Sequence, residues 1–382
     1  MDTYKRVPLR LETHKRIYYN QLFLQKYIKR IENFLEETPS MNTLEFASDA
    51  LEYKELKANN NIEGITDDIE EIEKAIRNEN NIPWNKKERI INLHRGYRYI
   101  LTHNDINKDT LRELYEILSK GLLDEYSIEN MGQYYRTKPV YILWDGRLDI
   151  QPIKGIKENE LEYYMNILLD FINNYEVNTN IDNFIKSQII HFYFVYIHPY
   201  FDVNGRTART VSMWHLLKNK AYPYIIFNRA ISLNKRKYTY KLNDVRRRGD
   251  ITLFLRYMLK EVLKEFEKEK IINNIKENSD EEITKSESLI LEYLLTLKGE
   301  LTILDLTTKY NAYNVYKSPD YIAQTYIYPL IEKGIIINNG PTKHKLTKEM
   351  PNIKIAISSD LIDINQDKIK SINLQKYLSK QL

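Results

Sequence analysis

Twelve consecutive residues, HPYFDVNGRTAR at positions 198–209, bring together side chains that suit chemistry at a phosphate group. His198 is a candidate general base, because the unperturbed pKa of an imidazole lies near neutrality. Asp202 is a candidate Mg²⁺ ligand through one oxygen, with substrate phosphates and water completing the octahedron. Arg206 and Arg209 are three residues apart, so they share one face of a helix. Two guanidinium groups on one face favour a di- or triphosphate over a single carboxylate.

The segments around this run are predicted to hold its polar residues on a turn. Apolar segments at 181–197 and 207–217 flank it, and Asn204-Gly205 is a turn signal because both residues tolerate positive φ. A turn that opens onto a helix directs backbone N–H groups outward and forms an anion pocket supported by the helix dipole. Each signal alone is more often an ordinary helix end, turn or solvated face. Their coincidence at one junction favours a phosphate site.

The composition predicts a helical, cytoplasmic protein. The 382 residues suffice for two or three domains, and only 11 Gly and 11 Pro accompany long stretches of Leu, Ile, Lys and Glu. A net charge of +4 implies no general attraction to nucleic acid or membranes, and the lack of cysteine excludes disulfides and thiol catalysis. The sequence contains neither a secretory h-region nor an apolar run of transmembrane length, so no membrane partner is predicted.

Hydrophobic periodicity predicts helices through most of the first 275 residues. They cover residues 14–37, 42–58, 66–79, 86–103, 109–120, 157–175, 181–197, 206–219, 233–247 and 250–275. The exception is 132–152, where Tyr, Val and Ile flank Asp145-Gly146 and predict a β-hairpin. Its unpaired edge could receive an extended segment of another protein, although a purely structural hairpin is an equal alternative from the residues alone.

A second pattern follows a charged, polar stretch that predicts a linker near 270–286. Helices are predicted at 286–297, 302–309 and 319–333, the last ending at Gly334, and a short hairpin follows up to residue 346. Three helices and a hairpin resemble a winged-helix domain. The expected recognition helix carries no basic residue before Lys333, so dimerisation or substrate recruitment is favoured over DNA binding.

The run at 198–209 resembles the signature of the Fic family, His-Pro-Phe-x-(Asp/Glu)-Gly-Asn-(Gly/Lys)-Arg-x-x-Arg. Residues 132–142 and 150–152 resemble the β-hairpin flap of that family, and residues 228–250 resemble the helical region after its motif. Residues 59–64, NNNIEG, resemble its inhibitory-helix motif, (Ser/Thr)-x-x-x-Glu-(Gly/Asn). The resemblance implies a mainly α fold: a Fic-type helical bundle with a β-hairpin flap, plus a small C-terminal winged-helix-like α/β domain. The predicted domains are an N-terminal helical region with the inhibitory motif at 1–85, a catalytic core at 86–270, a winged-helix-like domain at 285–350 and a tail at 351–382.

The resemblance implies a protein adenylyltransferase that moves AMP from ATP to a Ser, Thr or Tyr hydroxyl of a protein. His198 would deprotonate the hydroxyl, and Asp202 would hold Mg²⁺ or Mn²⁺. The other implied ATP contacts are Val203, Asn204, Gly205, Arg206, Arg209 and Tyr238, the last against the adenine, with helix packing as its alternative. Val140, Tyr141 and Ile142 on the flap would dock the target.

The same resemblance implies an internal brake. Glu63 would pair with Arg209, remove the partner of the γ-phosphate and leave ATP in an unproductive pose. The alternative is that Glu63-Gly64 is simply the end of a helix, where glycine is a common cap.

Three positions depart from the family pattern. Val203 stands where glycine is usual, and a β-branched residue resists a left-handed backbone. The inhibitory motif has Asn59 where Ser or Thr is usual, although an asparagine side chain can still form hydrogen bonds. Tyr200 replaces Phe and brings a hydroxyl that needs a partner if it is buried.

Several other functions fit the same residues. A Fic enzyme could transfer UMP or phosphate, or remove AMP, and a winged-helix transcriptional regulator could use a Fic-like half as a nucleotide sensor. A metal hydrolase built on His198 and Asp202 is disfavoured, because no further ligand stands at suitable spacing nearby. The predicted partners are ATP and a protein substrate, with the chain itself as one candidate substrate, a homodimer as one candidate assembly, and DNA as an open alternative.

Overall fold

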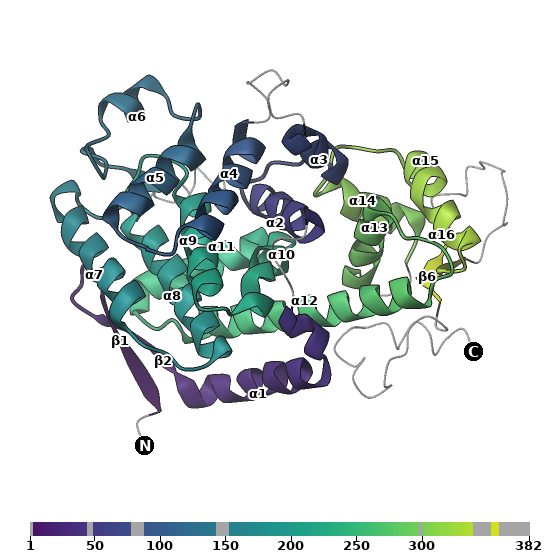
Figure 1. Cartoon of the computed structure of the whole chain (residues 1–382), viewed down its shortest axis with the longest axis horizontal. Helices are drawn as coiled ribbons and strands as arrows, with labels where there is room; N and C mark the ends of the chain where they lie inside the picture. Colours follow the sequence, from purple (N-terminus) through teal and green to yellow (C-terminus); the bar gives the residue numbers. More distant parts are fainter. Residues whose placement is uncertain are drawn as a thin grey trace. The chain divides into compact units, whose positions relative to one another are not determined.

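The computed structural model describes residues 3–43, 49–77, 88–142, 153–297, 301–338 and 353–358 (Figure 1). These residues are mainly helical, which confirms the predicted fold class. The chain divides into two compact units, one made of Met1–Gly64 with Ile72–Leu263 and the other of Ile65–Glu71 with Lys264–Leu382. The predicted N-terminal region and catalytic core therefore both fall largely in the first unit. In the described part of the chain, no helix combines the length and apolar character needed to cross a membrane.

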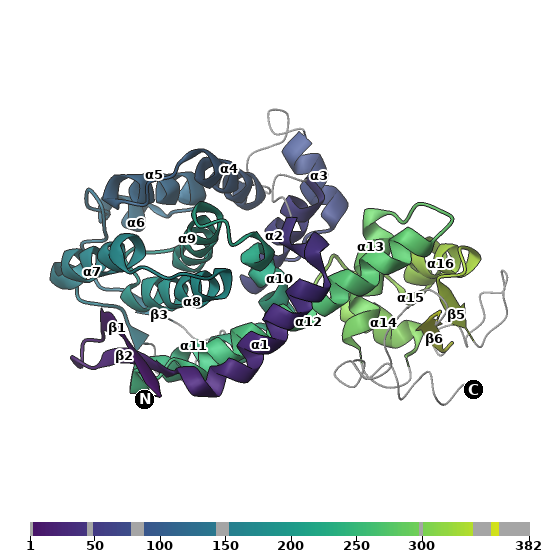
Figure 2. The ribbon, with the colours of Figure 1, turned by 60° about the horizontal axis from the view of Figure 1, so that its bottom comes forward.

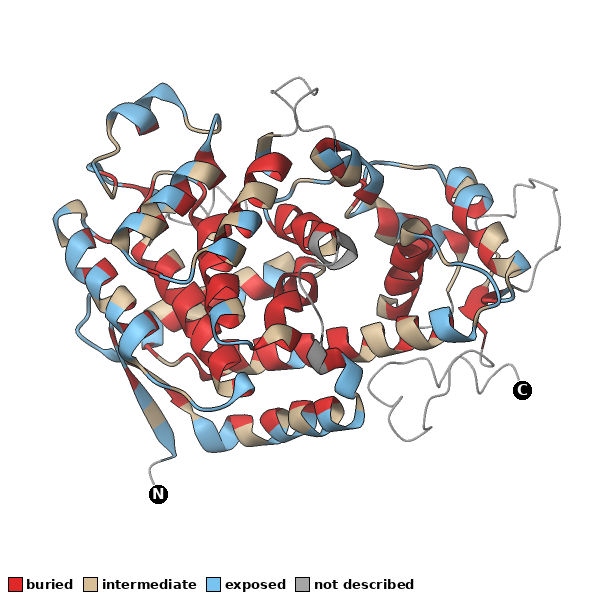
Figure 3. Cartoon of the chain, viewed as in Figure 1, coloured by how far each residue is buried: buried red, intermediate tan, exposed pale blue. Residues whose placement is uncertain are grey.

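Two buried helices form the centre of the first unit. They are α8 (Asn180–Ile197) and α9 (Asn204–Lys218), which pack against each other and are almost wholly buried (Figure 3). The helices α4 (Glu88–Thr102) and α5 (Lys108–Ser119) pack on α9, while α7 (Leu161–Asn174) packs on α8. Large apolar side chains of α4, α5, α7 and α8, mainly Leu, Ile, Phe and Tyr, supply the core around the junction where α8 ends and α9 begins.

Four further helices complete the surroundings of this centre. The helix α2 (Asp49–Ile62) packs on α4 and on the short α10 (Phe227–Ser232). The chain continues into α11 (Lys235–Arg248), which lies on the side of α8 and α9 opposite α4 and α5 (Figure 2). The long α12 (Thr252–Asn278) follows, and the boundary between the two units falls within it. Residues 270–278, predicted to begin a linker, are therefore helical.

The N-terminus differs from its prediction as a helix from residue 14. Residues Tyr4–Arg10 (β1) and Arg16–Asn20 (β2) form an antiparallel hairpin, and the helix α1 starts only at Gln21 and ends at Glu37. Alternate residues of β2 are buried, which is the period of a strand. Asn20 stops the strand and caps α1, since its side chain accepts a hydrogen bond from the N–H of Phe23 at 2.9 Å.

The predicted flap appears as a short antiparallel pair. Residues Tyr141–Ile142 (β3) pair with Ile153–Lys154 (β4). The segment that joins them, with Asp145-Gly146 and the Gln151-Pro152 dipeptide, lies outside the described residues. The short helices of the first unit are η1 (Pro39–Thr43), α6 (Glu125–Glu129), η2 (Glu158–Glu160) and η3 (Tyr222–Ile226), and α6 and η3 were not predicted. One more helix, α3 (Ile69–Arg77), carries the chain from the second unit back into the first.

The second unit contains three helical segments followed by a pair of strands. The helical segments are α13 (Lys285–Thr296), α14 (Ile303–Asn311) and a continuous run made of α15 (Pro319–Ile322), a π-turn (Ala323–Ile327) and α16 (Tyr328–Glu332). The π-turn precedes Pro329, which has no N–H for the helical ladder. The strands β5 (Ile336–Asn338) and β6 (Ile355–Ile357) are antiparallel. The strand that pairs with β5 lies inside the predicted tail, where three consecutive buried residues complete the core. The segment up to residue 346, predicted as the second strand of the hairpin, lies outside the described residues.

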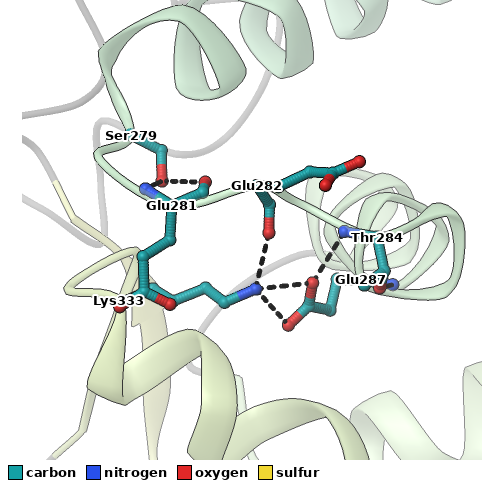
Figure 4. Close-up of polar contacts among 6 residues, drawn as sticks. All are labelled: Ser279, Glu281, Glu282, Thr284, Glu287 and Lys333. Carbon is teal, nitrogen blue, oxygen red and sulfur yellow. Dashed lines mark hydrogen bonds and ion pairs between the residues drawn. The ribbon is translucent and has the colours of Figure 1, made fainter.

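Lysine and glutamate side chains tie the chain between α12 and α13 to the third helical segment (Figure 4). Nζ of Lys333 donates to the carbonyl of Glu282 at 2.7 Å and to both carboxylate oxygens of Glu287 at 2.9 Å. Glu287 also accepts from the N–H of Thr284, which accepts in return, so the two form a capping box at the start of α13. Although burial opposes it, these hydrogen bonds and Lys333 hold the pKa of Glu287 below its ordinary value.

The segment Ile65–Glu71 is anchored inside the second unit by a buried carboxylate. Asp68 accepts hydrogen bonds from the hydroxyl of Tyr310 and from the N–H of Val315, both at 3.2 Å. Nζ of Lys317 lies 3.6 Å from its other oxygen. A buried carboxylate is tolerated only when it is paired and hydrogen-bonded in this way. The residues immediately after the predicted inhibitory motif therefore belong to the C-terminal unit.

Candidate active site

The junction between α8 and α9 is the predicted helix–turn–helix, but its left-handed residues are not the predicted ones. The backbone has φ 54° at His198 and φ 64° at Val203, whereas Asn204-Gly205 already forms the first turn of α9. The departure arises because the side chain of Asn204, rather than a glycine, bridges the turn to the backbone of Tyr200. A left-handed valine is rare and costs about 1–3 kcal/mol. The left-handed backbone that a β-branched residue resists is therefore present at Val203, and the turn is strained there.

Asn204 closes the turn through its side chain. Its Oδ1 accepts from the N–H of Tyr200 at 3.0 Å, and its Nδ2 donates to the carbonyl of Tyr200 at 2.8 Å. Tyr200 itself is buried and stacks on Tyr115, with ring centroids 3.6 Å apart. The first backbone N–H groups of α9 have no acceptor inside the helix, as at any helix start. Such amides are suited to bind an anion.

His198 is held neutral by its surroundings. Burial lowers the pKa of His198 to about 3, and the positive charges of Arg246 and Arg136 reinforce the shift. Its Nδ1 lies 3.4 Å from the carbonyl oxygen of Val195, a contact that requires Nδ1 to carry the proton. In that tautomer Nε2 keeps its lone pair, so the imidazole is in the form that a general base needs.

Arg136 connects the flap to the residues around His198. Its Nε donates to the carbonyl of His198 at 2.9 Å and its backbone N–H to that of Pro199 at 3.0 Å. The other end of its guanidinium donates to the carbonyl of Ile156 at 2.5 Å and pairs with Glu158 at 3.1 Å. Sequence reasoning assigned no role to Arg136, and a single arginine in an aromatic segment gave no signal for one.

Two buried arginines lie at the start of α9. Burial lowers the pKa of Arg206, and its Nε and Nη1 are buried without a hydrogen-bond partner among the described residues. Arg209 is buried too, but it is fully engaged: Nε donates to Oδ1 of Asn59 at 2.9 Å, and Nη2 pairs with Oε1 of Glu63 at 2.5 Å. Because a buried cation without a partner is costly, the unpartnered nitrogens of Arg206 favour binding of an anion at the start of α9.

The predicted contact between Glu63 and Arg209 is present. Glu63 follows the last residue of α2, and Gly64 then adopts φ 82°, so the glycine also ends the helix as the alternative proposed. Although burial raises it, the pKa of Glu63 is held below its ordinary value by Arg209, then by Arg206 and Lys235. Nδ2 of Asn59 donates to the hydroxyl of Tyr97 at 3.1 Å, so asparagine serves at this position by bonding in two directions.

The remaining predicted site residues lie around this centre with different exposures. Tyr238 is buried, its hydroxyl lies 2.8 Å from Nε2 of His191, and the two rings stack. On the flap, Val140 is buried and accepts from Gly155 through its carbonyl, Tyr141 is exposed and Ile142 is half-buried. Tyr238 thus makes a hydrogen bond and a ring contact inside the fold, and its role against an adenine stays a prediction.

Asp202 is the one predicted metal ligand, and its placement suits a shared site. It is exposed beside the start of α9, and Oδ1 accepts from the N–H of Val203 at 2.6 Å. Within the ranges that the structure describes, no three His, Cys, Asp or Glu side chains gather as a metal-binding group. A single exposed carboxylate fits Mg²⁺ that takes its other ligands from substrate phosphates and water.

Comparisons with known proteins agree with this geometry. Residues 105–216 match the model of the Fic/DOC family. A Fic family protein from Desulfovibrio desulfuricans G20 has a similar structure, with 18% identity, a TM-score of 0.52 and coverage of 88% of this chain and 96% of that one. A variant of Fic-1 from C. elegans is similar over 67% of this chain and 73% of that one, with 19% identity and a TM-score of 0.50. At these identities the structures show a shared fold, and the family match identifies residues 105–216 as a Fic domain.

Proposed function

We propose, with the Fic domain at residues 105–216 as the premise, that the protein is an adenylyltransferase that modifies protein hydroxyl groups and is restrained by Glu63. The oxygen of a Ser, Thr or Tyr side chain attacks the α-phosphorus of ATP. The bond from that phosphorus to the β-phosphate bridging oxygen breaks, so AMP is joined to the protein and pyrophosphate leaves. The hydroxyl proton passes to the base.

The observation that carries this proposal is the pair of buried guanidinium groups at the start of α9. Arg206 has two unpartnered nitrogens, and Arg209 is held by a carboxylate. The Glu63 carboxylate occupies the position that an anionic phosphate oxygen would take on Arg209. Two cations and the amides of a helix start are the donors that a triphosphate needs, and they act strongly because they are shielded from water.

The chain supplies a base and a set of phosphate contacts for this reaction. Nε2 of neutral His198 accepts the hydroxyl proton, and the first amides of α9 stabilise charge on the α-phosphate. Asp202 would hold Mg²⁺ or Mn²⁺, a cation that neutralises charge on the phosphates. Arg206 binds the phosphate chain. Tyr238 faces the adenine and the flap residue Tyr141 contacts the target in this proposal.

The restraint follows from competition for Arg209. While Glu63 pairs with it, the γ-phosphate has no partner there and meets a negative charge instead. ATP can then bind only with its phosphates displaced, so the α-phosphorus is not aligned with the attacking oxygen. A third of the Glu63 side-chain surface is exposed, so the carboxylate stands at the edge of the site and can leave it without opening the core.

Labelled ATP distinguishes this reaction from its rivals. Purified Glu63→Gly and Glu63→Gln proteins, incubated with Mg²⁺ and ATP labelled on the α- or the γ-phosphate, should incorporate only the α-label, at least tenfold faster than the wild type. Intact-mass spectrometry should show added AMP, and His198→Ala should abolish it in both backgrounds. Incorporation of the γ-label would show phosphate transfer, and no rise on removal of Glu63 would refute the restraint. UTP tested in parallel detects UMP transfer.

A further inference from the structure

The last carbonyl groups of α8, directly before His198, are capped by an arginine from another helix. Nη2 of Arg246, on α11, donates to the carbonyls of Val195 and Tyr196, both at 2.9 Å. Its guanidinium carbon also lies 5.0 Å from the centroid of the Tyr196 ring. The final carbonyls of a helix have no partner inside it, and a cation there also offsets the helix dipole.

One of these two carbonyls is shared with the candidate base. The oxygen of Val195 is 3.4 Å from Nδ1 of His198, and the same oxygen accepts from Arg246. A carbonyl held in place by Arg246 therefore offers a fixed acceptor for the Nδ1–H of the imidazole. The hydrogen bond on one ring nitrogen decides which nitrogen keeps the lone pair.

Three charged groups from different parts of the first unit act on His198. Arg246 comes from α11 and Arg136 from the segment before β3, and both disfavour a protonated imidazole. Glu63, after α2, favours it. Arg246 exerts the largest of these charge effects, and it alone also bonds the carbonyl that His198 contacts.

We propose that Arg246 is a positioning residue for the base: it holds the Val195 carbonyl, so that His198 keeps its proton on Nδ1 and presents a free Nε2, and it keeps the ring uncharged. The part that concerns turnover rests on the proposed function. The part that concerns the tautomer and charge of His198 does not, because both are properties of the chain without substrate.

Nuclear magnetic resonance of ¹⁵N-histidine in the full chain tests the second part directly. His198→Ala assigns the signals of His198. In wild-type protein they should report a neutral ring protonated on Nδ1 down to pH 5. In Arg246→Met the Nε2–H tautomer should become populated, and the ring should titrate about one unit or more closer to its ordinary pKa. Arg248→Met is the matched control, since Arg248 lies on the same helix with its side chain 69% exposed.

Arg246→Lys separates the effect of the positive charge from the effect of the hydrogen bond to Val195. It also replaces Arg246→Met as the test variant if the methionine variant does not fold. Lysine keeps the charge, so His198 should still resist protonation, while the loss of the guanidinium fork should weaken the preference for Nδ1. Unchanged tautomer and titration in a folded Arg246→Met protein would overturn the inference. So would a lysine variant in which His198 titrates near its ordinary pKa.

In the Glu63→Gly background, Arg246→Met should lower kcat for AMP transfer about tenfold or more and leave KM for ATP nearly unchanged. The acid limb of its kcat profile should move to higher pH, whereas Arg248→Met should match its parent. A purely structural role would lower activity at all pH values in proportion to the folded fraction and would contradict the proposal. If no variant transfers AMP but the magnetic resonance result holds, the proposed function fails and the positioning role stands.

Discussion

Gly205 faces Glu63 so closely that a Cβ atom on the glycine would lie 2.8 Å from Oε1 of Glu63. The same atom would lie 3.2 Å from Nη1 of Arg209. The helix start, the buried arginine and the carboxylate therefore fit together with no room for a methyl group. Glycine at this position is required by the neighbour across the site, not by the backbone of α9, which is an ordinary helix here.

A double-mutant cycle should detect this contact. Gly205→Ala alone should be neutral or destabilising, because the gain in helix propensity is offset by displacement of the Glu63 carboxylate. With Glu63→Ala the same change should stabilise the protein, and the coupling free energy should be about 1–2 kcal/mol. Urea unfolding of the four proteins measures it. Additive effects would show that Glu63 does not press on the helix start in solution.

Val203 should tolerate replacement by glycine far better than its burial suggests. Val203→Gly loses about 1.5–3 kcal/mol of apolar burial but relieves about 1–3 kcal/mol of left-handed strain, so its free energy of unfolding should change by only about 1 kcal/mol. Val211→Gly, also buried but within the regular part of α9, should cost about 3 kcal/mol or more. Equal losses in denaturant titrations of the two variants would contradict a strained turn.

Stability should fall as the pH drops below 6.5. Burial lowers the pKa values of His191, His198 and His215 to about 3, so each stays neutral in the folded state while the unfolded chain takes up a proton. The stabilisation is full above the unfolded pKa near 6.5 and is lost towards the folded value, by about 1.5 kcal/mol per histidine between pH 6.5 and 5. Urea midpoints across this range measure it. His215→Gln should flatten the dependence, and an unaltered slope would argue against its burial.

The sequence predicted which residues would lie near one another at the candidate site but misplaced the features that shape the backbone. The spacing of His198, Arg206 and Arg209 was sufficient to anticipate one cluster, because they lie at the end or on one face of neighbouring helices. The contact between the distant Glu63 and Arg209 was anticipated only from the resemblance to the Fic inhibitory motif. The turn itself was assigned to Asn204-Gly205 by residue preference. In the structure, side-chain bonds from Asn204 stabilise a left-handed Val203, and such tertiary overrides are invisible to local propensity.

Two arginines that hold the backbone around His198 could not be identified from the sequence. Arg136 donates to the carbonyl of His198, 62 residues away, and Arg246 donates to the carbonyl of Val195, 51 residues away. Because every residue has a backbone carbonyl, a sequence does not indicate which of them a distant side chain will bind. The hairpin of β1 and β2 was missed for a related reason. The alternation of buried residues in β2 is short and directly precedes the helical pattern of α1, so both were predicted as one helix.

The excursion of Ile65–Glu71 into the C-terminal unit means that the two units cannot be separated by one cut in the gene. A protein truncated after Leu263 would keep this segment but lose Tyr310 and Lys317, the partners of Asp68, and would uncover the buried Ile69. The segment directly after Glu63 would then have lost the side chains that anchor it and would expose an apolar residue close in sequence to Glu63. Removing the C-terminal unit would therefore also alter the surroundings of Glu63, the proposed inhibitory residue, so the intact chain is needed to measure the role of either.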